Sequence, residues 1–494
     1  MIKLFNFRPI VFGALSLALG IACAVLTTSM GAFAAILPII IIAGTSLAAR
    51  LVYKRNYYLI CGAAFILIFF IGFALIIGKV NFSADKNVGK IRETEFTATV
   101  KSVETLDNGE YRVILTDVKG NMLDFNGTDV SVDTPTAGLV RGDKVRGNAT
   151  FKKCALGFDN LHDLVNGIVF SPTERSVELI KTDSSAYFPE YIASEITRAV
   201  NKYAGDGAGV INALLLGRTD GIEESLLTRY RMAGIAHIFA VSGLHIGFFF
   251  TIFGFLFGLL KIKRWQKTVL TTLVTLFYVL ICASVSAYRA LIMCFIHGTC
   301  RSVGKKYDPM NSIFLSMFIV LCAFPTSLFG VGFILSYSAV ISLALFSGRF
   351  TKIFSFLPKK LSEVFAASLA VVLGTLPTIA LTFGYASAIT VFINLLFVPV
   401  VPIIYFLSLF GAIISVIIAQ GNIFLSLSAF LVHAINTVMT YVDFERFILN
   451  FNGNQILTML YAVTLILTTE KINFSKKVRR AIYIFLPVTA LMLI

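Results

Sequence analysis

Charged residues are scarce in this sequence. Only 14% of its 494 residues are Asp, Glu, Lys or Arg, whereas 57% are hydrophobic. Because soluble globular domains are about one quarter charged, this composition excludes an ordinary soluble protein. Apolar runs that are long enough to cross a bilayer as a helix, which takes about 20 residues, recur along the chain. The sequence therefore predicts a polytopic α-helical membrane protein embedded in a lipid bilayer.

Motifs for metal, redox and nucleotide chemistry are also absent. The seven cysteines form no CxxC pair, and Cys154 alone lies in the polar part of the chain, so no disulfide can form within that part. The five histidines include no HxHxDH or HExxH cluster. The segment GTCRSVGKK has too long a spacer for a phosphate-binding loop, and Lys306 stands where Ser or Thr would bind magnesium. We therefore expect no metal, no cofactor and no motor in this chain.

The net charge of +15 is typical either of a protein that binds nucleic acid or of a membrane protein whose cytoplasmic loops carry Lys and Arg. The second explanation suffices for most of the excess, because the basic residues concentrate in short connections between apolar runs.

Residues 1–78 form a first membrane region. Three apolar runs cover roughly 9–29, 31–49 and 57–78, and basic residues precede the first run and separate the second from the third. The excess of positive charge on the cytoplasmic side of membranes predicts a cytoplasmic N-terminus. The third run then brings the chain to the external side.

Residues 79–185 differ in pattern from the rest. EFTATVKSVE and EYRVILTDV alternate apolar and polar residues on either side of TLDNG, which predicts a β-hairpin. GDKVRGNATF and RSVELIK predict further short strands. We expect a small external β-barrel or sandwich, for which an OB-like barrel is one solution.

Residues 186–235 predict amphipathic helices that lie in the membrane interface, and residues 236–494 predict a second membrane domain. Its apolar runs bring the expected total to about 12–13 spans. The run 388–419 contains Pro399 and Pro402 and predicts a broken or re-entrant helix. If this run crosses once, every basic connection of the domain falls on the cytoplasmic side.

Polar residues interrupt these runs at a few positions. Ser242, Gly243 and His245 lie within one helical turn, and His237 precedes them. They are explained either by a helix packing contact with hydrogen-bonded side chains or by the lining of a water-filled path.

Arg289, Ser336 and Asn394 interrupt later runs in the same way. Arg289 either reaches from a helix end to the membrane interface or faces an anionic substrate. Ser336 and Asn394 either join helices by hydrogen bonds or line the same path. A serine hydrolase built on Ser242 and His245 is conceivable, although Ser242 lies outside a GxSxG motif and two helical residues three apart need not aim their reactive atoms at each other.

Four blocks of sequence resemble the competence core of the ComEC family of DNA-internalisation channels. In chain order they are ALLLGRTDGIEESLLTRYRMAGIAHIFAVSGLHIG, SAYRALIM, LFGVGFILSYSAV and LGTLPTIALTFGYASAITVFINLLFVPVVP. The resemblance covers roughly residues 205–405, and AVSGLHIG is its most specific part. The preceding β-domain is similar to the OB-fold domain of that family.

The resemblance implies a channel, not an enzyme, that imports single-stranded DNA across the bacterial cytoplasmic membrane during natural transformation. It implies a DNA path lined by Arg218, His237, Ser242, Gly243, His245, Arg289, Ser336 and Asn394. Many members of the family continue into a metallo-β-lactamase-like domain, whereas this sequence stops at Ile494 without its zinc ligands. We therefore expect a separate nuclease, a DNA receptor, and a cytoplasmic ATPase or strand-binding protein as partners.

Two other functions stay open at this point. One is the intramembrane serine hydrolase, and the other is a transporter of a different anionic polymer or of a lipid.

Overall fold

The computed structural model describes residues 8–30, 38–44, 46–47, 57–82, 94–105, 110–120, 123–124, 129–153, 165, 168–173, 176–184, 188–219, 221–282, 284–418, 422–451, 453–469, 486 and 489–490. The chain divides into two compact units. The first unit comprises Pro9–Tyr191 and Met317–Gly330, and the second, here called the helical unit, comprises Met1–Arg8, Ile192–Ser316 and Val331–Ile494.

The first unit contains two membrane helices that cross in close contact. They are α1 (Pro9–Met30) and α3 (Tyr57–Phe82). A Cβ atom on Gly20 would lie 2.0 Å from the carbonyl oxygen of Phe69, so the backbones can approach this closely only at a glycine. Such small-residue contacts are typical of helix pairs in membranes. The expected run 31–49 lies largely outside the described residues.

The first unit also contains a β-sheet. Its strands are β1 (Thr94–Thr105), β2 (Tyr111–Gly120), β3 (Leu123–Asp124), β4 (Asp129–Thr134), β5 (Asp143–Ala149), β6 (Phe151–Lys153), β7 (Ile168–Pro172) and β8 (Ile180–Ser184). Their order is β6-β7-β4-β2-β1-β5-β8, with β3 beside β2. Only the pairing of β4 with β7 is parallel among the described strands. Buried and exposed residues alternate along β5, which places one face of this strand against the core.

The β-hairpin predicted from TLDNG is confirmed by the antiparallel pairing of β1 with β2. Most of its turn and Cys154 lie outside the described residues. The strand expected in RSVELIK is shifted, because β8 begins only at Ile180. Among the described strands, β6 and β8 form the two edges of the sheet and no pairing joins them, so a closed barrel is not shown.

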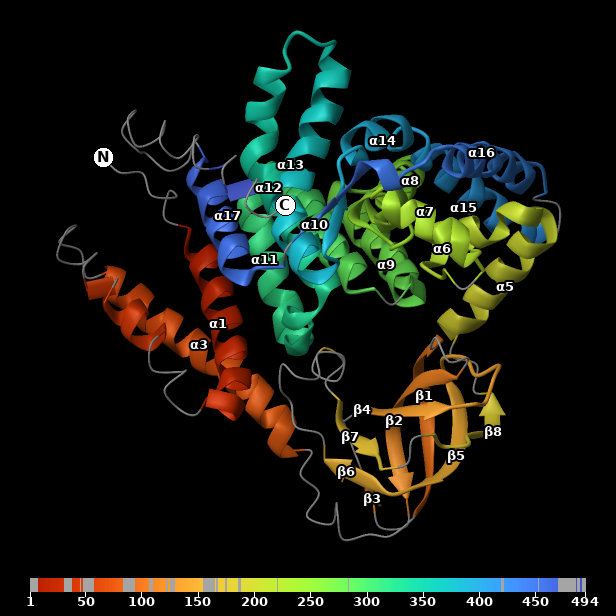
Figure 1. The fold of residues 1–494 in the computed structure, drawn as a ribbon, viewed down its shortest axis with the longest axis horizontal. Coiled ribbons are helices and arrows are strands. Elements are labelled where there is room, and N and C mark those ends of the chain that lie inside the picture. The colour runs from red at the N-terminus through yellow and green to blue at the C-terminus, as the bar shows by residue number, and fades with distance from the viewer. Residues whose placement is uncertain are drawn as a thin grey trace. The chain divides into compact units, whose positions relative to one another are not determined.

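The helical unit contains most of the remaining helices. In chain order the helices after the sheet are α5 (Phe188–Tyr203), α6 (Ala208–Leu216), α7 (Glu224–Met232), α8 (Gly243–Gly258), α9 (Arg264–Cys282), α10 (Val285–Val303), α11 (Pro309–Ala323), α12 (Val331–Ile353), α13 (Lys359–Thr382), α14 (Thr390–Phe397), α15 (Val401–Ile418), α16 (Asn422–Tyr441) and α17 (Gln455–Leu467). The expected amphipathic segments correspond to α5 and α7. Figure 1 shows α12 and α13 as a long antiparallel hairpin.

Seven helices of the described chain are long and apolar enough to cross a membrane, or eight if the bent pair α14–α15 counts as one span. This supports a polytopic membrane protein but gives fewer spans than the expected 12–13. Helices α11 and α17 have 15 and 13 residues, about 20–22 Å in length, and fall short of a hydrocarbon core of about 30 Å. Helix α10 carries Arg289, His297 and Arg301 and is not among the seven.

The break predicted at Pro399 and Pro402 is confirmed, because α14 and α15 meet at an angle of 45°. The chain does not, however, pass simply from α13 into a further crossing. The rings of Phe392 in α14 and Phe365 in α13 have centroids 5.8 Å apart. Phe365 lies near the start of α13, about 27 Å along the helix from its C-terminal cap at Phe383.

Residues 383–389 therefore carry the chain back alongside α13, although Phe383 and Ile389 at the two ends keep helical dihedral angles. The segment is extended only at its centre. It contains β9 (Tyr385–Ser387), which pairs antiparallel with β10 (Ile448–Asn450). The short helix η5 (Glu445–Phe447) immediately precedes β10.

Two contacts hold α12, α13 and α17 together. A Cβ atom on Gly374 of α13 would lie 1.7 Å from Oγ of Ser342 in α12, so these helices touch where only glycine fits. Pro377 has no N–H with which to bond the carbonyl of Leu373 one turn earlier. The hydroxyl of Tyr461 in α17 donates a 3.2 Å hydrogen bond to that carbonyl instead.

We predict that Tyr461→Phe lowers stability by about 1–3 kcal/mol, because the Leu373 carbonyl then has no donor. Thermal unfolding of the detergent-solubilised protein measures the change. Tyr441→Phe is the matched control, since the Tyr441 side chain is exposed and surface changes usually stay within about 0.5 kcal/mol. In a Pro377→Ala background, where residue 377 regains its N–H, Tyr461→Phe should cost less. An equal cost in both backgrounds would contradict the assignment.

Candidate functional site

Ser242 and His245 form a reciprocal cap at the start of α8. Oγ of Ser242 accepts a 3.3 Å hydrogen bond from the N–H of Leu244, and Nδ1 of His245 accepts a 3.2 Å hydrogen bond from the N–H of Ser242. Side chains that satisfy the first free N–H groups of a helix in this way form a capping box. The sequence predicted that Ser242, Gly243 and His245 lie within one helical turn. Ser242 instead caps the helix from outside, because α8 begins at Gly243.

The ring of His245 is buried against α15. It stacks on Tyr405 with ring centroids 4.9 Å apart and an interplanar angle of 30°. Because Nδ1 accepts a hydrogen bond from the backbone, the ring proton of the neutral imidazole sits on Nε2, which is buried and meets no acceptor. A general base for Ser242 would need a free Nδ1, whereas Oγ lies 3.4 Å from a nitrogen that the backbone already uses. This geometry does not favour a serine nucleophile.

Arg289 lies beside this cap and is 5% exposed. Its Nη1 donates to the carbonyl of Ser336 in α12, and its Nη2 donates to Oγ of Ser286 over 3.4 Å. A Cβ atom on Gly243 would lie 3.3 Å from Nη2, so the absence of a side chain there leaves room for the guanidinium. The start of α8 therefore packs directly on Arg289.

Further polar contacts join Arg289 to α11 and α12. Oγ of Ser286 and Oγ of Ser336 are 2.7 Å apart, and the guanidinium carbon lies 5.6 Å from the ring centroid of Tyr337. The hydroxyl of Tyr337 is 3.4 Å from Oγ of Ser316 in α11. Helices α8, α10, α11 and α12 thus converge on one polar cluster, here called the Arg289 cluster.

The guanidinium of Arg289 has no carboxylate partner in the described part of the chain, and its Nε is buried without an acceptor. A buried charge is costly unless it is paired, and arginine offers five N–H donors in a fork that matches phosphate or carboxylate oxygens. The Arg289 cluster therefore has the chemistry of an anion-binding site. Groups of three His, Cys, Asp or Glu side chains that could hold a metal ion do not occur among the described residues.

Asn394 belongs to a separate polar contact. Its Nδ2 donates a 3.0 Å hydrogen bond to Oγ of Ser368 in α13, and its Oδ1 is buried without a donor. The predicted path residues Arg218 and His237 lie in connections that precede α8, and His237 is close enough to His245 for their charges to interact. Arg218 follows the C-terminal end of α6, and His237 is exposed in the short helix η3 (Ala236–Ile238), where Nδ1 lies 3.2 Å from the carbonyl of Gly234.

The sequence did not reveal Ser286, Ser368, Tyr278 or Tyr405. Tyr278 of α9 donates a 2.5 Å hydrogen bond to the carbonyl of Leu215 near the end of α6. Each of these side chains resembles its apolar or small neighbours in the sequence, and its role depends on a partner far along the chain. No local pattern signals such pairings.

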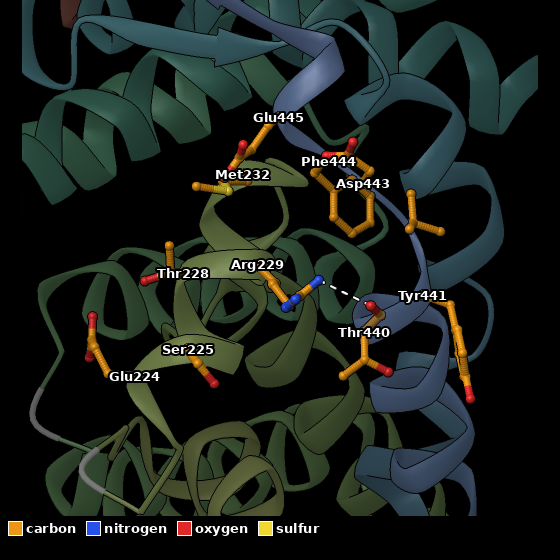
Figure 2. Close-up of a pocket in the computed structure, with 11 residues that line it drawn as sticks. Glu224, Ser225, Thr228, Arg229, Met232, Thr440, Tyr441, Asp443, Phe444 and Glu445 are labelled. Atoms are coloured by element: carbon orange, nitrogen blue, oxygen red, sulfur yellow. Dashed lines mark hydrogen bonds between the residues drawn. The ribbon is translucent and has the colours of Figure 1, made fainter.

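A groove between α7 and the C-terminal end of α16 was also not foreseen (Figure 2). It has a volume of about 650 Å³, and its lining residues are Glu224, Ser225, Thr228, Arg229, Met232, Thr440, Tyr441, Val442, Asp443, Phe444 and Glu445. Arg229 points across it and donates a 3.1 Å hydrogen bond to the carbonyl of Thr440. Nearby, burial raises the pKa of Tyr230, whose hydroxyl donates to Asn436 over 2.8 Å. The two helices are therefore joined by polar contacts.

A family model described as "Competence protein" matches residues 214–472. The chain belongs to this competence-protein family. All the predicted path residues, the Arg289 cluster and the groove lie inside the matched region.

A curated relative supports the same assignment. ComE operon protein 3 of Bacillus subtilis (strain 168) is 31% identical to this competence protein over 270 residues, which are 53% of this chain and 34% of the relative. The match thus spans about a third of the relative's length. No solved structure matches the chain.

We predict that Ser242→Ala destabilises the protein by about 1 kcal/mol, because the N–H of Leu244 loses its acceptor, whereas Ser242→Asn stays near the original stability. Thermal unfolding in detergent measures both. A serine-directed activity probe should label neither the original protein nor Ser242→Ala. Labelling that disappears in Ser242→Ala would support the hydrolase.

Proposed function

We propose that this competence protein is a membrane channel that imports single-stranded DNA across the bacterial cytoplasmic membrane during transformation. Its membership of the competence family and its similarity to ComE operon protein 3 support a role in DNA uptake. The observation that carries the channel proposal is Arg289, a buried cation that meets no carboxylate among the described residues and lies where several helices converge. Ionisable residues inside membrane proteins usually mark the path of an ion or substrate.

The orientation of the helices supports an external position for the Arg289 cluster. Helices α8, α10 and α12 all begin near the cluster and end near basic connections, which include Lys261, Lys305 and Lys352. Basic connections face the cytoplasm in most membrane proteins. The cluster would then stand at the external mouth of the path, with a cytoplasmic N-terminus and an external β-domain, for which an OB-like barrel remains our proposal.

The path must open before a strand can pass. His245 and Arg289 are 1% and 5% exposed, and the backbone of Gly243 packs closely on the guanidinium. A phosphate backbone needs water and cations along a hydrocarbon thickness of about 30 Å. We propose that the arrangement described here is closed, and that opening separates the start of α8 from Arg289.

Partners complete the proposal. An inside-negative potential opposes entry of an anion by about 2.3 kcal/mol per charge for each 100 mV. A cytoplasmic ATPase or strand-binding protein would supply the pull, a separate receptor would deliver the DNA, and a separate nuclease would remove the other strand. A transporter of a different anionic polymer or of a lipid would use the same cluster, so vesicle assays with labelled DNA and labelled lipid compare the two substrates.

We predict that deletion of the gene abolishes transformation while binding of DNA to the cell surface continues. Counting transformants and surface-bound labelled DNA in the same cultures separates the two steps. Normal transformation of the deletion strain would contradict the proposed function.

We predict that Arg289→Met lowers transformation by about 10–100-fold, because one charge-assisted hydrogen bond to a phosphate contributes about 1.5–3 kcal/mol. Its folded stability should change little, since replacing a buried charge with an apolar side chain of similar size is often neutral or stabilising.

The matched control is Arg349→Met. Arg349 lies toward the other end of α12 and donates to the carbonyl of Thr468 over 3.1 Å, so transformation should stay within a few-fold of normal. If Arg289→Met transforms normally, or if it fails only because the protein unfolds, the anion-binding role of Arg289 is wrong.

A further inference from the structure

The ribbon formed by β9 and β10 begins at the C-terminal end of α13 and packs against this helix. Gly384 follows the C-terminal cap of α13, and its carbonyl accepts a 2.8 Å hydrogen bond from Phe451. At the other end the N–H of Ala388 donates to Phe447 over 2.9 Å. The chain then returns along α13, because Phe392 contacts Phe365 near the start of this helix. The ribbon therefore lies beside the C-terminal part of a helix that is long enough to span the membrane.

Extended backbone at this depth cannot face lipid. In a two-stranded ribbon half of the backbone N–H and C=O groups point away from the partner strand, and the described residues provide no third strand beside β9 and β10. Hydrocarbon satisfies none of these groups, so irregular backbone occurs at membrane depth only inside protein or against water. Protein does not cover this ribbon completely, because Leu449 is 37% exposed and Asn450 is also exposed. The remaining neighbour is water.

The groove between α7 and α16 continues into the ribbon. Phe444 and Glu445 line the groove, and η5 leads directly from Glu445 into β10. On the side of β9, Oγ1 of Thr390 donates to the carbonyl of Ala233, which follows α7, over 3.3 Å. Both strands of the ribbon are therefore connected to elements that border the groove.

The charges of the groove nearly balance. Glu224 and Asp443 form ion pairs with Arg231 and Arg446 at 2.6 and 2.8 Å, and Arg229 and Glu445 both line the groove. A nearly neutral polar lining neither repels a polyanion strongly nor holds it. Passage through a channel requires this combination, since binding must be weak enough for release.

We infer that the β9–β10 ribbon and the α7–α16 groove line one water-filled vestibule through which the DNA strand passes beside the Arg289 cluster. This inference rests on the proposed function for the identity of the strand, but not for the presence of water. The vestibule is wet whether or not DNA uses it.

Thiol labelling tests the water. In a variant of the full chain without its native cysteines, Asn450→Cys and Leu449→Cys are compared with Val463→Cys and Met459→Cys on α17, which are 52% and 66% exposed and face lipid if α17 lies in the membrane. Ser355→Cys, in the connection between α12 and α13, reports full access to water. The reagent is a small, charged, membrane-impermeant methanethiosulfonate, added to right-side-out and to inverted membrane vesicles.

We expect residues 449 and 450 to react at least about 100-fold faster than 459 and 463, because a charged reagent enters hydrocarbon with a penalty of about 2.5–3.5 kcal/mol. Two positions guard against a local folding defect at one of them, and size-exclusion profiles check each variant. If both ribbon positions react as slowly as the α17 positions, the vestibule is wrong.

Protection by DNA tests its use. With the purified protein in liposomes, single-stranded DNA should slow labelling at 450 and leave labelling at 355 unchanged. Fast labelling without protection by DNA would support the water-filled vestibule but contradict the passage of the DNA strand through it. Loss of labelling at the ribbon in a protein that still supports transformation would overturn the vestibule and leave the proposed function standing.

Discussion

Inside a membrane, every backbone carbonyl and N–H that the helix itself does not bond must find a partner within the protein. In the helical unit that partner is repeatedly a side chain from another helix. Tyr461 bonds the carbonyl that Pro377 leaves free, and Tyr278 bonds the carbonyl of Leu215 near the end of α6. Each such bond both satisfies a polar group and fixes the distance between two helices. The arrangement of the bundle therefore follows from where its helices end or break.

The sequence predicted the membrane class and the β-hairpin, because apolar runs and alternating patterns are local signals. The broken pair α14–α15 was also readable, since prolines interrupt an otherwise apolar run. The β9–β10 ribbon was not readable. Tyr385–Ser387 looks like a continuation of the apolar segment, and its partner strand lies about sixty residues further along the chain. Strand pairing at that separation depends on tertiary contacts that no short window contains.

Some members of the Arg289 cluster were named from the sequence, but their grouping was not. Ser242, Gly243, Arg289 and Ser336 converge, and His245 joins them through the cap. Asn394 instead pairs with Ser368, Arg218 follows α6, and His237 lies in η3 before the cap. Sequence spacing shows that a polar residue interrupts an apolar helix, but the direction in which its side chain points depends on how neighbouring helices rotate. Glycine was the more informative residue, because Gly243 marks the space that the guanidinium of Arg289 occupies.

The contact between Gly374 and Ser342 limits how this protein can change shape. Two helices that touch backbone to side chain at a glycine cannot slide past each other without a steric clash. We therefore expect α12 and α13 to move as one rigid body. Ser336 would then move with the α12–α13 hairpin, and Arg289 would move with α10. Widening must then take place where other helices meet, such as between the start of α8 and Arg289, where polar groups form bonds that water can replace.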